Sequence, residues 1–281
     1  MRNFVGKAGR ALGFGLLFFV LRTVQLWSGF DHATGLALSP AAGTALAVCL
    51  ALAAAVEILL ALKRSGEKLP FRRRFAPAGE MKLPLVMGGM LLALGGALLA
   101  AGNLVPIRGG VYMAQSAAGV LGIAAGVGVV IFTQQAGRRA EQSVLPLLPA
   151  MFFGVFLVLS EYLPEADNPV LARYYIPVLA SALTAYAFSA LAGCVQGEAS
   201  PRWFTPVAEL AAALCIAAIA DGIGPFYPVA RVQPGKPLVY GGCALLLLSF
   251  LALQRRDGEL PAEEEAHEDA DGEAEEGSAE A

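Results

Sequence analysis

The sequence predicts an all-α membrane protein: a polytopic transmembrane helical bundle of about eight spans. Eight separate stretches of about twenty mostly apolar residues lie between residues 11 and 254, each bounded by charged residues or by Pro and Gly. A helix rises about 1.5 Å per residue, so about 18 or more apolar residues are enough to cross a hydrocarbon core of about 30 Å. Charged residues make up 15% of the chain, against roughly 25% in soluble domains, which argues against a soluble fold.

The boundaries of the spans follow from where each apolar stretch ends. We expect them at residues 11 to 29, 42 to 62, 84 to 104, 113 to 133, 144 to 162, 174 to 195, 204 to 223 and 238 to 254. The first is interpreted as an uncleaved helix and not a signal peptide, because its apolar run continues to Trp27 and no small-x-small cleavage site follows it.

Glycines and prolines indicate how the later spans pack and begin. The third span contains Gly88, Gly89, Gly95 and Gly96, and the fourth contains Gly122 and Gly126 at small-xxx-small spacing, which favours close helix approach. We place the prolines of the fifth, sixth and seventh spans mainly in first turns, where a missing N–H costs little. These are Pro146, Pro149, Pro177 and Pro206.

Basic residues predict the orientation in the cell membrane. Alternate connecting segments hold 15 Lys and Arg residues on one side and 4 on the other, and positive charges are retained in the cytoplasm during insertion. Both termini are therefore predicted to be cytoplasmic. The bundle is expected over residues 1–256. Residues 257–281 hold 12 of the 23 carboxylates and no Lys or Arg, which predicts a disordered acidic tail. This tail is expected to be solvated, to contact a basic partner or to fold over the chain's own Arg72 to Arg74.

Few residues suggest a cofactor, and we expect none. Cys49, Cys194, Cys215 and Cys243 lie within predicted spans without a CxxC pair, and His is nearly absent. No set of His, Cys and carboxylates has metal-ligand spacing, and neither a P-loop nor a GxGxxG motif is present. Enzymatic function is accordingly the least favoured class.

Ionisable side chains at membrane depth are costly and become the candidate functional residues. The outer layer consists of Arg22, Gln25, Glu161 and Asp221, with Asp31 just beyond the first span. If their helices are neighbours, Arg22 can pair with Glu161 or Asp221 in an outward-open pocket that suits a small charged or zwitterionic ligand. Two other interpretations stay open: a structural ion pair, and an interfacial position reached by a snorkelling side chain.

The inner layer consists of Glu57 and Glu209, at similar depth near the cytoplasmic ends of their spans. Each is a candidate proton carrier in a coupled transporter. Each also lies seven residues from an arginine, Arg64 or Arg202, so neutralisation of basic groups at the inner surface is the alternative. In the longest cytoplasmic loop, Arg72 to Arg74 with aromatic neighbours either enforce topology or bind anionic lipid headgroups or a phosphate-bearing protein partner.

The first span and the segment after it carry a local resemblance. The pattern LRxxQ, then FDxxTGL, resembles a first-helix signature of a group of uncharacterised bacterial multipass membrane proteins. It covers about 16 of 281 residues, from Leu21 to Leu36. The resemblance implies an integral membrane protein of the same kind, transfers no reaction, and adds weight to Arg22, Gln25, Asp31, Thr34 and Gly35. In physical terms, Asp31 to Gly35 predicts a turn.

Two function classes therefore lead. A small-molecule permease, or a substrate-binding membrane component, predicts a cavity lined by Arg22, Gln25, Glu161 or Asp221. A non-catalytic membrane scaffold or partner subunit predicts a tightly packed bundle that makes contacts through the basic loop and acidic tail. Neither class involves nucleic acid.

Overall fold

The computed structural model describes residues 2–32, 36–63, 71, 75–76, 79–102, 110–135, 144–163, 170, 173–196, 201–223 and 235–254. This described part contains eight helices that are long and apolar enough to cross a membrane, which confirms the predicted all-α, eight-span bundle. They are α1 (Arg2–Ser28), α2 (Ala41–Lys63), α4 (Lys82–Gly102), α5 (Gly110–Gln135), α6 (Leu148–Tyr162), α7 (Tyr175–Val195), α8 (Pro201–Ile223) and α9 (Gly235–Leu253). Short 3-10 turns, η1 (Gly79–Met81) and η2 (Leu145–Leu147), precede α4 and α6.

Several helices begin earlier than the apolar pattern predicts. Helix α1 starts at Arg2, although its apolar stretch begins only at Ala8, because helical backbone continues past the hydrocarbon boundary. Helix α9 starts at Gly235, three residues before the predicted span, and this brings Lys236 inside the helix. The acidic tail and Arg72 to Arg74 lie outside the described residues, so their predicted roles stay predictions.

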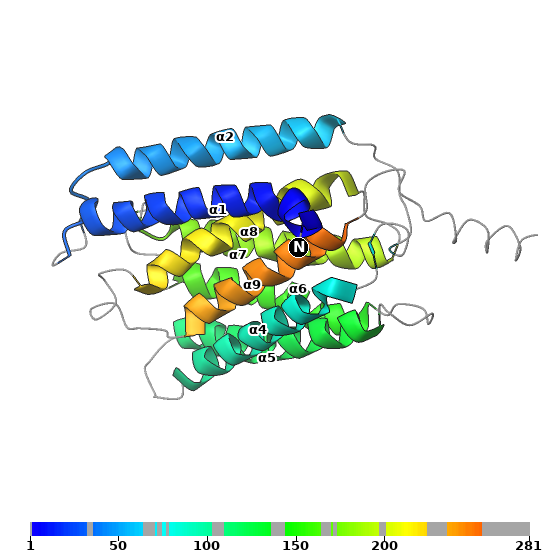
Figure 1. Cartoon of the computed structure of the whole chain (residues 1–281). Coiled ribbons are helices and arrows are strands. Elements are labelled where there is room, and N and C mark those ends of the chain that lie inside the picture. The colour runs from blue at the N-terminus through cyan, green and yellow to red at the C-terminus, as the bar shows by residue number, and fades with distance from the viewer. Residues whose placement is uncertain are drawn as a thin grey trace, which may run out of the picture.

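Helices α8 and α9 form the centre of the bundle. About 72% of the membrane stretch of α8 and 67% of that of α9 is buried. Helices α4, α5, α6 and α7 follow one another around this centre, with α4 against α9 and α7 against α8. Helix α1 packs on α8, and α2 lies outermost against α1 and α8, with only 22% of its stretch buried (Figure 1). The start of α1 and the end of α9 lie at the same end of the bundle.

The glycines of α4 and α5 permit close helix packing, as predicted. A Cβ atom on Gly126 would lie 2.3 Å from the carbonyl oxygen of Gly89, and one on Gly96 would lie 2.6 Å from that of Gly119. Such distances are too short for any side chain, so the two backbones touch directly. On the other side of α4, Gly95 meets the start of α9 in the same way, near Gly235.

The placement of Pro206 differs from the prediction. Because α8 begins at Pro201, Pro206 lies inside the helix and not in its first turn. Pro201 is the residue that occupies the first helical position, where proline is favoured. Pro149 and Pro177 do lie in the first turns of α6 and α7, and Pro146 lies in η2.

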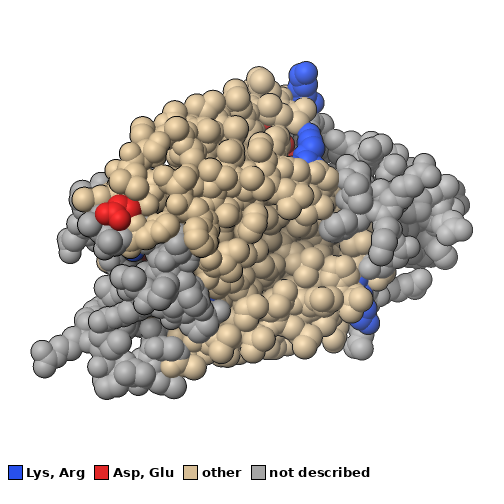
Figure 2. Space-filling model, turned by 60° about the vertical axis from the view of Figure 1, so that its left-hand side comes forward, with Lys and Arg blue, Asp and Glu red and all other residues tan. Residues whose placement is uncertain are grey.

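The surface between the two ends of the bundle is apolar. Leu52 and Leu59 on α2, Met90 on α4 and Val120 on α5 are more than half exposed, as expected for side chains that face lipid. Figure 2 shows a broad belt without charged side chains, with Lys and Arg gathered at one end of the described surface. These observations make the chain an integral membrane protein.

Two phenylalanines of the basic loop pack into the bundle at the end where α9 finishes. Phe71 and Phe75 stack with ring centroids 4.4 Å apart and are 7% and 3% exposed. Phe75 also meets the rings of Phe204 and Phe250 edge-on, and the Ala76 N–H donates to the Leu253 carbonyl at 2.8 Å. These aromatic neighbours of the arginines therefore fix this part of the loop to the helices.

Candidate functional site

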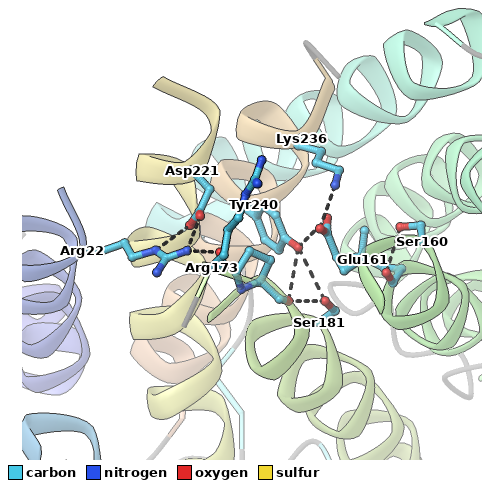
Figure 3. A network of polar contacts seen from close by, with 10 residues as sticks. Arg22, Ser160, Glu161, Arg173, Ser181, Asp221, Lys236 and Tyr240 are labelled. Carbon is cyan, nitrogen blue, oxygen red and sulfur yellow. Dashed lines mark hydrogen bonds and ion pairs between the residues drawn. The ribbon is translucent and has the colours of Figure 1, made fainter. Parts of the chain in front are cut away.

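Arg22 lies fully buried on α1 and connects this helix to α8 and to the chain at the start of α7. Its Nη2 and Nε donate to the two carboxylate oxygens of Asp221 on α8, at 2.5 and 3.2 Å (Figure 3). Nη1 donates to Gln25 at 2.8 Å, and Nη2 also donates to the carbonyl of Arg173, just before α7. The guanidinium lies 5.7 Å from the centre of the Tyr175 ring. A bidentate pair of this kind fixes both partners in orientation as well as in distance.

Glu161 forms a second polar centre beside the first. At the end of α6, its Oε2 accepts from Lys236 Nζ at 2.7 Å, and its Oε1 accepts from the Tyr240 hydroxyl at 2.9 Å. The Tyr240 hydroxyl also lies 3.3 Å from the Pro177 carbonyl and 3.5 Å from Ser181 Oγ, both on α7. This centre therefore connects α6, α7 and α9.

The two centres form one cluster, which we call the outer charge cluster: Arg22, Asp221, Glu161 and Lys236. Asp221 interacts electrostatically with both Glu161 and Lys236 in addition to Arg22. The side chains of Asp221 and Lys236 are 22% and 26% exposed, whereas Arg22 and Glu161 are almost completely buried. Two cations and two anions leave the cluster without net charge, and its exposed members are one of each sign.

Near the opposite ends of the helices lies the inner carboxylate pair, Glu57 on α2 and Glu209 on α8. They are 0% and 2% exposed. Arg10 Nη2 on α1 lies 2.7 Å from Glu209 Oε1, and Arg10 Nε lies 3.9 Å from Glu57 Oε1. The Arg10 side chain is 42% exposed. Both carboxylates thus face the same guanidinium.

The two polar layers are held by the same pair of parallel helices. Arg10 pairs with Glu209 and Arg22 pairs with Asp221, so each partner lies 199 residues further along the chain. Between the two pairs, Gly15 brings α1 close to α8: a Cβ there would lie 2.6 Å from Ile216 and 3.3 Å from the Ala213 Cα. Helices α1 and α8 are therefore joined by an ion pair near each end and by close backbone contact in the middle.

The structure brings together most of the residues that the sequence selects. The predicted pairing of Arg22 with a carboxylate is seen with Asp221, whereas Glu161 pairs with Lys236. Asp31 follows α1, and its backbone N–H donates to the Leu36 carbonyl at 2.9 Å, which closes part of the predicted turn. Thr34 and Gly35 lie outside the described residues, and a ligand role for Asp31 stays a prediction.

The arginine that pairs with Glu209 differs from the one that sequence proximity suggests. Arg202 donates instead to the carbonyls of Ala61 and Leu62 at the end of α2, at 2.9 and 3.4 Å. The ion pair with Glu209 is made by Arg10, which the sequence analysis used only as a topology signal. Sequence reasoning also missed two members of the outer site, Lys236 and Tyr240. Their i and i+4 spacing at the start of α9 is the signal that identifies them as neighbours.

The fold and the buried charges define a polytopic integral membrane protein with polar residues organised in two layers. No protein-family model, curated protein or solved structure matches the chain. Function is accordingly argued from the geometry of the two layers alone.

Proposed function

We propose that the protein is a permease, or the substrate-binding membrane component of one, for a small solute that carries both a positive and a negative group. The observation that carries this proposal is the outer charge cluster, in which two ion pairs lie side by side with one carboxylate and one ammonium partly exposed. Charged groups at membrane depth are expensive, and those that are present commonly pair with one another and mark substrate or ion pathways.

The chemistry of the cluster favours a zwitterion over a simple ion. A ligand ammonium can bind the exposed Asp221 while a ligand carboxylate binds Lys236, whose ammonium has three donors. A bound zwitterion adds one positive and one negative charge, so the outer charge cluster and its ligand together stay neutral. A ligand of one sign would leave an uncompensated charge in a region of low dielectric constant, which costs several kcal/mol.

The bias of 15 to 4 in the basic residues supports an orientation in which this cluster lies toward the outside of the cell membrane and both termini lie in the cytoplasm. In that orientation the cluster receives solute from outside. The resemblance of the first helix to a group of bacterial multipass proteins is compatible with this proposal and adds no substrate.

Thermal unfolding of the purified full-length protein in lipid nanodiscs tests the proposal. We expect at least one solute, from a panel of amino acids and other small zwitterions, to raise Tm increasingly with concentration, because a ligand that binds only the folded state stabilises it by about 2.7 kcal/mol at 100 times Kd. Analogues lacking either charged group should produce no shift.

The matched variants separate binding in the cluster from a general effect of the solute. Glu161→Gln combined with Lys236→Gln removes one pair without leaving a lone charge, and should abolish the shift. Lys82→Gln, a single exposed cation at the start of α4, should retain it. The proposal is wrong if no zwitterion raises Tm, or if the double variant responds as the wild type does.

A second candidate function is a non-catalytic scaffold or partner subunit. One observation favours it: each of the three guanidinium nitrogens of Arg22 donates a hydrogen bond to a described protein group. An arginine bound so completely holds helices together and needs no ligand. For a scaffold, apolar replacement of the Arg22–Asp221 pair retains both the fold and the function, whereas a permease loses its response to solute.

A further inference from the structure

We propose that the hydroxyl of Tyr175 binds the ammonium group of the solute together with Asp221, so that the protein selects zwitterions whose ammonium carries N–H groups. This inference rests on the proposed function and names the class of solute that the outer charge cluster accepts. Tyr175 is the first residue of α7 and is a specificity-determining residue in this proposal.

Tyr175 lies beside the ion pair that contains the exposed carboxylate of the cluster. The centre of its ring lies 5.7 Å from the Arg22 guanidinium, which donates to both carboxylate oxygens of Asp221. Tyr175 interacts electrostatically with both members of this pair. The Asp221 side chain is 22% exposed, and Tyr175 is only partly buried. A small solute that reaches Asp221 from its exposed side therefore comes close to Tyr175 as well.

The hydroxyl of Tyr175 is an open hydrogen-bonding position. It is buried and has no hydrogen-bond partner within the part of the chain that the structure describes. Buried polar groups without a partner are costly and rare in folded proteins, so each of them needs an explanation. A tyrosine hydroxyl can both donate and accept. At the outer charge cluster, a contact with a bound solute supplies the explanation.

Tyr240, at the second ion pair, shows how a purely structural tyrosine differs. Its hydroxyl donates to Glu161 at 2.9 Å and lies 3.3 Å from the Pro177 carbonyl (Figure 3). The Tyr240 side chain is only 1% exposed. Each ion pair of the cluster thus has one tyrosine beside it. Among the described residues, Tyr175 is the one of the two whose hydroxyl is left for a ligand.

The hydrogen-bonding needs of an ammonium group fit this open hydroxyl. An ammonium has three donors, and in a region of low dielectric constant a donor without an acceptor is costly. Asp221 supplies one acceptor, because a carboxylate accepts at about four positions and Arg22 uses two of them. The Tyr175 hydroxyl supplies a second. Other oxygens around the cluster already accept bonds from protein groups: both of Glu161, the side-chain oxygen of Gln25 and the Arg173 carbonyl.

The ring of Tyr175 is poorly placed for an ammonium without N–H groups. Quaternary ammonium groups are bound through the faces of several aromatic rings. The guanidinium of Arg22 already lies over the Tyr175 ring, so a second cation on that side would meet its positive charge. The arrangement therefore favours an ammonium that is recognised through its N–H donors.

Thermal unfolding in nanodiscs with the N-methyl derivatives of a responding amino acid tests this selectivity. We expect the apparent Kd of the wild type to rise with each methyl group, and the trimethylated form to produce no shift in Tm. Tyr175→Phe should weaken binding of the unmethylated solute by about tenfold, because it removes a hydrogen bond to a charged group. It should also reduce the difference between the methylated forms. Tyr186→Phe, on the same helix and 53% exposed, should bind as the wild type does.

A second measurement, made without solute, separates a lost contact from a damaged fold. Because the Tyr175 hydroxyl bonds to no described group, Tyr175→Phe should unfold at a Tm no lower than that of the wild type. Tyr240→Phe loses the hydrogen bond to Glu161 and should unfold at a lower Tm. A clear drop in Tm for Tyr175→Phe would overturn the inference, since its hydroxyl would then be bonded within the protein.

Two results of the binding experiment would also overturn it. One is an equal Kd for the unmethylated solute in the wild type and in Tyr175→Phe. The other is a trimethylated solute that raises Tm as much as the unmethylated one. Either result leaves the proposed function standing, because a zwitterion still binds. If no zwitterion shifts the Tm of the wild type, the proposed function is wrong and this inference is wrong with it.

Discussion

Replacing Arg22 and Asp221 singly and together separates the two interpretations of the outer layer. Arg22→Met leaves the Asp221 carboxylate without its bidentate partner, and Asp221→Leu leaves a fully buried guanidinium. Removing one member of a buried pair costs about 3 to 5 kcal/mol. We expect values near 3 kcal/mol for Arg22→Met, because Asp221 is 22% exposed and Lys236 lies nearby, and larger values for Asp221→Leu.

The double variant should lose less stability than the two single losses added together, by about 2 kcal/mol, because neither charge is then left without a partner. Thermal unfolding in nanodiscs measures this, and a loss of about 3 kcal/mol corresponds to roughly 10 °C for a chain of this size. Additive losses would refute the conclusion that the two residues act as a pair. A folded double variant that no longer responds to zwitterions supports the permease, and one with unchanged function supports the scaffold.

Three further predictions concern packing and topology. Gly126→Ala should lower the free energy of unfolding by about 1 to 3 kcal/mol, because the new Cβ would lie 2.3 Å from a backbone oxygen. Gly13→Ala is the control and should leave stability unchanged, because nothing lies within 4 Å of its Cβ position. Equal Tm values for the two variants would contradict the close contact of α4 and α5. Phe75→Ala should lower the free energy of unfolding by about 3 kcal/mol, because the ring is 3% exposed and packs among other rings. Phe152→Ala is the control, since the Phe152 side chain is 58% exposed. An effect of Phe75→Ala no larger than that of the control would mean that the ring does not hold the loop. A cytoplasm-active reporter fused after Gln254 should be active; activity of a periplasm-only reporter there would reverse the orientation.

The fold was predictable because lipid imposes one strong rule on the sequence. Each span must be apolar over a length that the bilayer fixes, so composition alone locates eight helices. Their ends were less predictable, because a helix continues into the interface for as long as its backbone is satisfied. The early start of α9 is the case that mattered, since it makes Lys236 a neighbour of Glu161 and not a loop residue.

The partners of the buried charges were harder to predict than the charges themselves. Hydropathy marks Arg22, Glu57 and Glu209 as exceptional, but it does not say which helices are adjacent. Proximity along the chain pointed from Glu209 to Arg202, seven residues away, whereas the bond is made by Arg10 across 199 residues. The close contact of α1 and α8 depends on Gly15, a single small residue, and this is too weak a signal to read in isolation.

Helix α2 shows how polar contacts attach a helix that packs little against the rest of the bundle. Apolar side chains gain little by leaving lipid for another helix, so association in a membrane depends on close packing and polar contacts. Only 22% of the membrane stretch of α2 is buried, which leaves packing a small share of its attachment. Its polar contacts with α1 and α8 include Glu57 facing Arg10, and Arg202 bound to its last carbonyls. This least firmly packed helix also touches Gln25, which accepts a hydrogen bond from Arg22, so the attachment of α2 bears on the outer charge cluster as well.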